Sequence, residues 1–190
     1  MPYEPPPELA ALSLAEIAEA VAARRLPPVD QWSPARVGDS RMRIGADGRW
    51  YHDASPITRP AMKRAFASLL VRDADGQHWL VTPQEKLSIE VDDAAFVATD
   101  MELRHNSEGR PALAFRIDTD EFVIADADHP IRATGDPATP AIYLGVRHGT
   151  EARLNRSTYA QLIEHALDVS TGRTLAVESG GARFILAPAP

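Results

Sequence analysis

The chain lacks cysteine altogether among its 190 residues. Disulfide bonds, a cysteine nucleophile, thiolate-bound iron–sulfur clusters and zinc sites with thiolate ligands are therefore excluded. The chain also lacks any apolar run of about 20 residues, the length that a bilayer-spanning helix needs. Its N-terminus opens with Glu4 and three prolines, where a secretory signal would place basic and then apolar residues. We therefore expect a cytoplasmic protein with no membrane partner.

Positive charge is scarce. Twenty Lys and Arg residues stand against 27 Asp and Glu residues, which gives a formal net charge of -7. A nucleic-acid-binding domain needs basic residues in excess to neutralise phosphates and release counterions. The charge balance therefore argues against DNA or RNA as a partner. The negative charge is regional, because residues 90–128 hold eleven carboxylates against three arginines, and we expect a solvated acidic face there.

The sequence motifs of several enzyme classes are also missing. No HExxH metal-binding pair, G-x-S-x-G nucleophile elbow, P-loop or Rossmann glycine fingerprint occurs. The six histidines are scattered, and the acidic residues from 118 to 128 lack the glycine of a calcium-binding loop. We therefore expect no metal and no cofactor. A carboxylate general acid–base pair needs no motif, so an enzyme remains an alternative.

An amphipathic helix is the first feature that the chain does contain. Apolar residues follow the proline-rich start with helical spacing, at Leu9, Leu12, Ile17 and Val21. Ser13 and Glu16 have the spacing of a capping box, and the prolines at 27 and 28 end the helix. The sequence predicts a helical arm and linker over residues 1–39.

Residues 40–110 predict a first unit, in which short strands surround one helix. The helix is predicted from Pro60 to about Leu70, and strands and hairpin turns flank it. Its apolar stripe is formed by Met62, Phe66, Leu69 and Leu70. Thr82 and Glu85 have the spacing of a second capping box, which predicts one helical turn before the last strand.

Residues 111–190 predict a second unit, again with one helix among strands. The strands are predicted at 112–117, 122–125, 142–146 and 152–154, and a hairpin at 174–178 and 182–187. The helix is predicted over about Ser157–Asp168, with its buried positions at Tyr159, Leu162, Ile163 and Leu167. Strands and helices are mixed without the spacing of βαβ units, so the sequence favours an α+β fold over a doubly wound sheet.

The two units show the same order of predicted elements. At an offset of 97 residues, Arg59 aligns with Arg156 and Phe66 aligns with Ile163. Both windows read as strands, a capping residue, an arginine, a helix and a hairpin. This order favours an internal duplication. Few of the aligned residues are identical, so coincidence is the alternative.

Four segments carry recognisable motifs, at Gly48–Tyr51 leading to Pro56–Arg59, at Phe66–Leu70, at Leu80–Lys86, and at Tyr143–Arg147 followed by Glu151–Arg153. Together they resemble a bacterial family known as domain of unknown function 1285, over roughly residues 40–187. The resemblance implies a duplicated core of two units, the second superficially similar to pleckstrin-homology folds. It also implies a nucleotide-like ligand between the units and a role in signal transduction with a protein partner.

Arg59 and Arg156 are the strongest candidates for ligand binding. Each is predicted in the first turn of a helix, where the helix dipole makes a positive side chain unfavourable. Backbone N–H groups at a helix start can bind phosphate or carboxylate together with a guanidinium group. In the alternative interpretation, each arginine pairs with a carboxylate of the neighbouring unit and fixes the interface.

The other candidate ligand contacts are Thr82, Glu85, Lys86, Arg147, Trp50 and Tyr143. The hydroxyl, carboxylate and ammonium groups of the first three suit a polar ligand, although the capping box already explains the threonine and the glutamate. The arginine would add positive charge near the second helix. The two aromatic residues would stack on a base, and core positions explain them equally well.

We therefore expect a non-enzymatic module that binds or senses a small, nucleotide-like anion in a groove between the two units. One alternative is an enzyme that acts on a phosphorylated metabolite, with Glu85 or His52 as the base and the arginines as electrostatic clamps. Another alternative is a protein-interaction adaptor, in which the second unit grips a partner peptide and no small molecule takes part.

Overall fold

The computed structural model describes residues 12–24, 26–170 and 174–188. Within these ranges the chain is a mixed α+β protein with two six-stranded sheets, one two-stranded sheet and few helices. It divides into two compact units. The N-terminal unit extends to Phe96 and includes the segment Val146–Glu151, and the C-terminal unit takes Val97–Gly145, the residues from Ala152 on, and the first helix.

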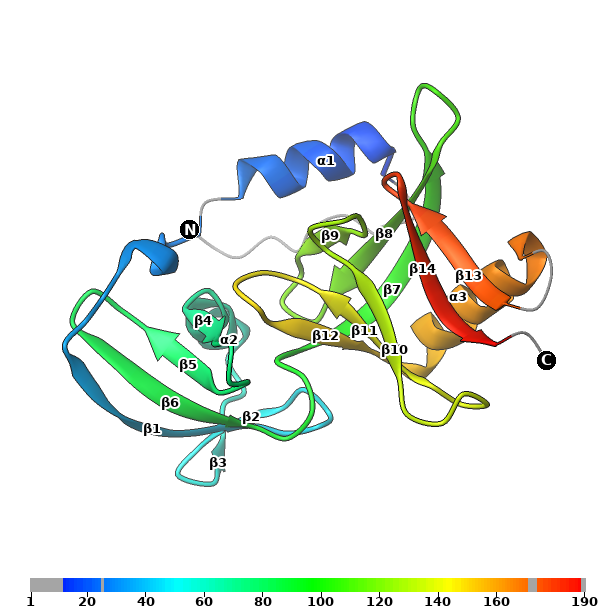
Figure 1. Cartoon of the computed structure of the whole chain (residues 1–190). Helices are drawn as coiled ribbons and strands as arrows, with labels where there is room; N and C mark the ends of the chain where they lie inside the picture. The colour runs from blue at the N-terminus through cyan, green and yellow to red at the C-terminus, as the bar shows by residue number, and fades with distance from the viewer. Residues whose placement is uncertain (1–11, 25, 171–173, 189–190) are drawn as a thin grey trace. The chain divides into compact units, whose positions relative to one another are not determined.

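The N-terminal unit is a curled sheet around one helix (Figure 1). Its strand order is β3-β2-β1-β6-β5-β4, in which β1 and β6 run parallel and the other neighbours run antiparallel. A short 3₁₀-helix precedes the sheet. The elements are the 3₁₀-helix (Val29–Gln31), β1 (Arg36–Ile44), β2 (Trp50–His52), β3 (Ser55–Pro56), α2 (Pro60–Ala67), β4 (Leu70–Arg72), β5 (His78–Val81) and β6 (Glu85–Val91).

Helix α2 faces the inner side of this sheet. Pro60 occupies its first turn, as expected, because proline has no N–H group to leave unsatisfied there. The helix ends at Ala67, three residues before the expected end, because Leu70 pairs with Leu80 and so begins β4. The stripe is buried unevenly: Leu70 is fully buried, whereas Met62 is 41% exposed. The N-terminal half of the helix therefore leaves part of the sheet uncovered.

Strand β1 carries a bulge that opens the sheet locally. The parallel register with β6 shifts between Asp39 and Arg43, and Arg41 adopts a positive φ of 55° within the shift. The Ser40 hydroxyl takes the place of backbone hydrogen bonds between the two strands at the bulge. It donates to the Ser88 carbonyl (2.7 Å) and accepts from the Met42 amide (3.1 Å). Bulges of this kind bend a strand and redirect its side chains.

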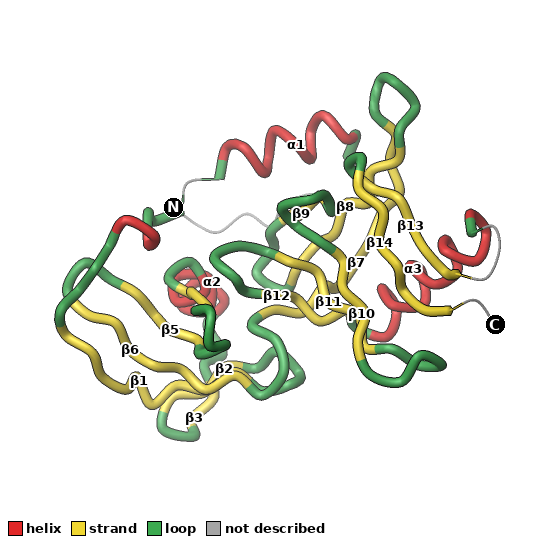
Figure 2. Tube along the Cα trace, viewed as in Figure 1, coloured by secondary structure: helices red, strands yellow, loops and turns green. Residues whose placement is uncertain are grey.

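The C-terminal unit contains the second large sheet, in the order β10-β11-β12-β7-β8-β9, and a separate hairpin, β13-β14 (Figure 2). Helix α3 packs against β13. The large buried residues include Leu113, Phe115, Ile142 and Leu144. The elements are α1 (Leu14–Ala23), β7 (Phe96–His105), β8 (Pro111–Ile117), β9 (Phe122–Ile124), β10 (Ile131–Thr134), β11 (Ala141–Gly145), β12 (Glu151–Leu154), α3 (Arg156–Val169), β13 (Thr174–Ser179) and β14 (Ala182–Pro188).

The expected helical arm is confirmed as α1, and it belongs to the C-terminal unit. Ser13 and Glu16 form the capping box that their spacing predicts. Ile17 is fully buried against Ala114, and Leu12 packs on the same cluster. Residues 1–11, which begin the expected arm, lie outside the described residues. The helix is therefore one wall of a hydrophobic core.

Several expectations need correction. The segment that starts at Thr82 is a turn, because Glu85 enters β6 and pairs along β1. The buried positions of α3 are Thr158, Leu162 and Ala166, whereas the expected core residue Leu167 is 55% exposed. The expected unit boundary after residue 110 falls in the turn between β7 and β8, which pair with each other and lie in one unit.

Candidate functional site

A groove of about 670 Å³ lies inside the N-terminal unit. Its floor is the inner face of the sheet, and its wall is the exposed stripe of α2. The apolar residues of the lining include Met42, Ile57, Met62, Phe66, Leu69, Leu80 and Leu87. The groove lies beside the β1 bulge, and the partly exposed Met62 of α2 contributes to its wall.

Arg59 lies at the mouth of this groove. It is the residue immediately before α2, its side chain is exposed, and it lines the groove. No described residue forms a hydrogen bond, ion pair or ring contact with its guanidinium group. The helix dipole opposes a cation at this position. Arg59 is therefore a positive charge without compensation beside an apolar surface.

The helix start itself offers few amide donors, contrary to expectation. Pro60 has none, and the amides of Met62 and Lys63 both donate to the Arg59 carbonyl at 3.1 Å. Ala61 supplies the one remaining amide of the first turn. An anion at this end of α2 would therefore depend on the arginine side chain.

Backbone strain occurs at Arg41, which lines the groove, and at the turn that follows His52, another lining residue. Arg41, Asp53 and Ala54 are non-glycine residues with positive φ angles of 55°, 48° and 63°. The Asp53 amide donates to the Arg41 carbonyl (3.1 Å), and the two side chains form an ion pair at 3.4 Å. His52 lies beside Asp53, with Nε2 at 3.7 Å from a carboxylate oxygen. Residues in such conformations cost about 1–3 kcal/mol each and gather at ligand sites and turns.

Thr82 and Glu85, two of the candidate ligand contacts, also line the groove. The Thr82 hydroxyl accepts from the amides of Gln84 (3.3 Å) and Glu85 (3.1 Å), but the predicted capping box of a helix does not form, since the Thr82 amide donates to the backbone carbonyl of Glu85 (2.9 Å) in a turn. The Glu85 carboxylate pairs with Arg36 at 3.4 Å. Both groups therefore already have partners within the protein.

Lys86 and Arg147 do not line the groove. Lys86 points to the other face of β6, where its ammonium lies 4.2 Å from the centre of the Trp79 ring. Arg147 is partly buried, donates to the Ala67 carbonyl at 2.9 Å and lies 4.8 Å from the Phe96 ring centre. Burial lowers the pKa of Arg147 to about 10. Both cations have structural contacts in the N-terminal unit.

The two candidate stacking residues occupy core positions. Trp50 is 2% exposed and stacks on Phe66, with ring centres 6.5 Å apart. Tyr143 belongs to the C-terminal unit, where the guanidinium groups of Arg132 and Arg153 lie 4.7 and 5.2 Å from its ring centre. Neither ring has an open face that a base would need for stacking.

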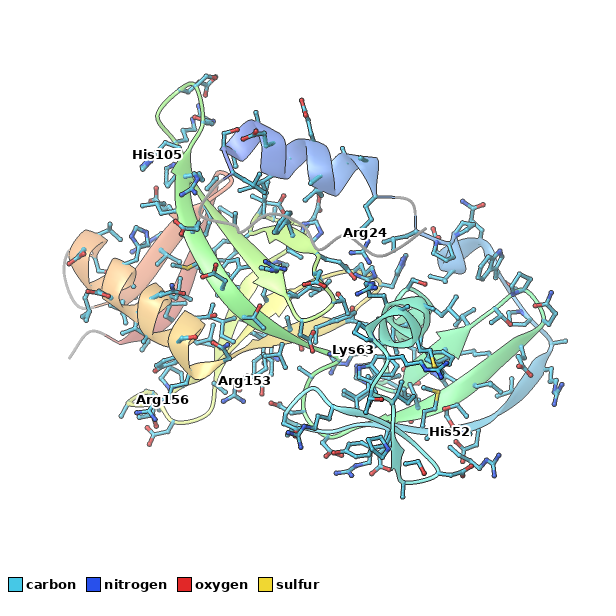
Figure 3. All side chains as sticks on the ribbon, turned by 180° about the vertical axis from the view of Figure 1, so that it is seen from behind. Arg24, His52, Lys63, His105, Arg153 and Arg156 are labelled. Carbon is cyan, nitrogen blue, oxygen red and sulfur yellow. The ribbon has the colours of Figure 1, made fainter. Side chains whose placement is uncertain are left out.

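Arg156 is the first residue of α3, as predicted, and its side chain is exposed at the start of that helix near Arg153 (Figure 3). Asn155 caps the helix and accepts from the Thr158 amide at 2.9 Å. No described residue bonds to the Arg156 side chain. Arg59 and Arg156 thus share a place at a helix start, each within its own unit.

Comparison with known proteins places the chain in a family. The model for the N-terminal domain of a domain of unknown function, DUF1285, matches residues 27–94, and the model for the C-terminal domain of that family matches residues 95–186. The chain belongs to the DUF1285 family. The resemblance seen in its motifs is thus confirmed, and the two models meet close to Phe96, where the compact units divide.

Two solved DUF1285 structures are similar to this protein. One, from Silicibacter pomeroyi DSS-3, shares 37% sequence identity over 94% of this chain and 96% of its own, with a TM-score of 0.78. The other, from Shewanella baltica OS155, shares 23% identity over 65% of this chain and 90% of its own, with a TM-score of 0.52, and supports the fold alone. No curated protein matches the chain.

Sequence reasoning missed much of the groove in this DUF1285 protein. Arg41 carries no local signal, because its role depends on a bulge that forms only when β1 pairs with β6. Met62 and Leu69 were identified as an apolar stripe, but the pattern shows only that a stripe exists and not what covers it. The alternation of Leu87 with Lys86 would have indicated which of the two faces the sheet interior.

The acidic region of this DUF1285 protein is partly neutralised. Asp92 pairs with Arg43, and Asp120 pairs with Arg116 at 2.8 Å. Glu121 is only 8% exposed. Within the described residues, no group of three His, Asp or Glu side chains is placed to hold a metal ion. None of the described helices has the length and apolar character to cross a membrane.

Proposed function

We propose that the N-terminal unit is a non-enzymatic module that binds a small organic anion in its groove. The observation that carries this proposal is Arg59, a cation with no partner among the described residues, at the mouth of a groove with an apolar lining. An anion there would compensate both the guanidinium charge and the helix dipole.

The size and chemistry of the groove support this proposal. Its volume of about 670 Å³ lies within the range of roughly 300–1,000 Å³ that is typical of small-molecule sites. Its apolar lining would gain about 25 cal/mol for each Å² removed from water. Arg41, a lining residue with a strained backbone conformation, fits a ligand-binding edge.

The expected internal duplication, cytoplasmic location and role in signalling remain part of the proposal. Both units place three strands, a helix and a hairpin in the same order, β1-β2-β3-α2-β4-β5 and β10-β11-β12-α3-β13-β14. This order supports descent from one duplicated unit. The pleckstrin-like character of the second unit, a cytoplasmic location, a nucleotide-like ligand between the units and a role in signal transduction with a protein partner stay predictions.

The test is a thermal-shift panel on the full chain. Nucleotides, sugar phosphates and organic carboxylates are screened against the wild type and Arg59→Ala. A ligand at a hundred times its Kd stabilises by about 2.7 kcal/mol, or roughly 5–10 °C in Tm for a chain of this size. Arg49→Ala is the matched control, because Arg49 is also exposed but does not line the groove.

Each outcome decides between the functions. Stabilisation that is lost in Arg59→Ala and kept in Arg49→Ala supports the groove. If Arg156→Ala loses as much ligand stabilisation as Arg59→Ala, the result favours the predicted site to which both arginines contribute. Consumption of a phosphorylated compound, followed by phosphorus NMR, would instead identify an enzyme, and Glu85 or His52 would then be the bases to replace. No shift from any compound contradicts the proposal and leaves the adaptor alternative.

A further inference from the structure

The lining of the groove is aliphatic rather than aromatic. Its apolar side chains include Met42, Ile57, Met62, Leu69, Leu80 and Leu87. The lining contains two rings, Phe66 and the imidazole of His52, and the Phe66 ring already stacks on Trp50 with planes 17° apart. Flexible thioethers and branched aliphatic side chains pack well around a chain of methylene groups. A flat base, in contrast, is normally held by stacking on a free aromatic face.

The charged groups of the groove suit one negative charge and not several. Arg41 pairs with Asp53, and Glu85 pairs with Arg36, both at 3.4 Å. Asp39 and Glu85 add two carboxylates to the lining, so a polyphosphate would meet repulsion there. Among the described lining residues, Arg59 is the guanidinium that no partner neutralises. One such fork matches one carboxylate or a similar acidic head group.

Three of the polar groups in the lining are already engaged in hydrogen bonds. The Ser40 hydroxyl is engaged with Ser88 and Met42, and the Thr82 hydroxyl accepts from two backbone amides. Asp39 accepts from the Arg41 amide at 2.8 Å. A base needs donors and acceptors along its edge, and these three groups are already occupied, which leaves the exposed side chains of His52, Ser55 and Thr58 among the polar lining residues. A hydrocarbon chain makes no such demand.

We infer that the ligand of the groove is an amphipathic aliphatic anion, a carboxylate with an acyl chain, rather than a nucleotide. The carboxylate binds Arg59 at the mouth, and the chain lies between α2 and the inner face of the sheet. This inference rests on the proposed binding function of the groove and names its ligand class.

The experiment measures binding of four probes to the full chain by calorimetry, below the concentration at which the probes form micelles. Hexanoate and decanoate test chain length, 1-decanol tests the charge, and AMP tests the nucleotide. Decanoate is expected to bind at one site per chain. Affinity is expected to rise about fourfold for each methylene group, until the groove is filled.

Two pairs of variants locate the ligand. Arg59→Ala is expected to weaken decanoate binding at least tenfold and to leave 1-decanol unchanged, and Arg49→Ala is its control. Met62→Glu places a carboxylate in the wall and is expected to weaken both probes at least tenfold. Ala65→Glu adds the same charge to an exposed helix position that does not line the groove and lies farther from Arg59, and it is expected to change neither affinity.

The outcomes separate this inference from the proposed function. AMP bound more tightly than decanoate, and dependent on Arg59, overturns the aliphatic ligand while the anion-binding function stands. Decanol bound as tightly as decanoate overturns the role of the charge. Decanoate affinity that is equal in Met62→Glu and wild type places the chain elsewhere and overturns the inference. If none of the probes binds and the wider panel is also negative, both proposals are wrong.

Discussion

The carbonyl oxygen of Arg72 lies against the α-carbon of Gly149. A Cβ atom built at Gly149 would lie 2.6 Å from that oxygen, and the φ angle of the glycine is +76°. The amide of Arg72 donates to the His148 carbonyl at 2.9 Å. The segment Val146–Glu151 thereby joins the edge strand β4 and completes the N-terminal unit.

We predict that Gly149→Ala destabilises the protein by at least about 2 kcal/mol, because the new methyl group combines a left-handed φ angle with a backbone clash. Urea unfolding measures the change. Gly109→Ala is the control, since its φ angle is +75° and a Cβ atom there meets nothing within 4 Å. It should cost about 1 kcal/mol. Equal losses in the two variants would show that the contact with Arg72 is unimportant.

We predict that Ser179→Ala destabilises the protein by about 2–3 kcal/mol. Ser179 is fully buried, and its hydroxyl donates to the Ala125 carbonyl (2.6 Å) and accepts from the Leu113 amide (2.8 Å). Alanine would leave both backbone groups buried without these partners. Thermal unfolding gives the measurement, with the exposed Ser107→Ala as a control that should change stability by less than about 0.5 kcal/mol. A neutral Ser179→Ala would contradict the bridging role.

We predict that Arg24→Ala loosens α1. Arg24 follows the last residue of the helix and pairs with Glu121, which also accepts from the Thr119 hydroxyl at 2.6 Å. Removing the cation would leave a buried carboxylate without its ion pair, at a cost of about 2 kcal/mol. Hydrogen exchange of the α1 amides should rise in Arg24→Ala and less in Arg24→Ala with Glu121→Gln. Unchanged exchange in the single variant would mean that apolar contacts hold the helix alone.

We predict that the protein loses stability on acidification below about pH 6.5. Burial is the main cause that lowers the pKa of His78, followed by the nearby charge of Arg72, while Asp73 and Glu151 raise it. The unfolded chain therefore takes up the proton first, and stability falls as pH falls through the unfolded pKa and then the folded pKa. His78→Gln should reduce this fall, measured as urea midpoints between pH 7.5 and 5.5. Burial also lowers the pKa of His148 and His165, so part of the dependence should remain.

Local signals predicted the regular elements well. The capping box at Ser13 and the proline at the start of α2 lie within a few residues of the backbone that they fix, and both helices begin as expected. The ten-residue strand β7 was not predicted, because its acidic residues Asp100 and Glu102 alternate with apolar ones in a region that was interpreted as a solvated face. Such a strand forms when its neighbours in the sheet pair with it and one of its faces is buried, and for β7 these neighbours are β8 and β12.

The candidate site residues likewise fall into those that local sequence identified correctly and those whose orientation depends on tertiary contacts. Arg59, Thr82 and Glu85 were identified from their place at helix and turn starts, and all three line the groove. Lys86 and Trp50 were also candidates, but neighbouring strands and the helix determine where those side chains point. Lys86 lies on Trp79, and Trp50 is covered by Phe66.

By itself the sequence determined the family, the α+β class, the helix starts and the arginine at the start of each of α2 and α3, because these depend on residue types and on spacings of a few residues. Only the tertiary structure decided that an apolar groove exists. The groove requires that Asp39 pair with Ser88 across 49 residues, that β1 bulge at Arg41, and that the stripe of α2 be left partly uncovered. Such contacts depend on the packing of the whole unit, and local propensities do not encode them.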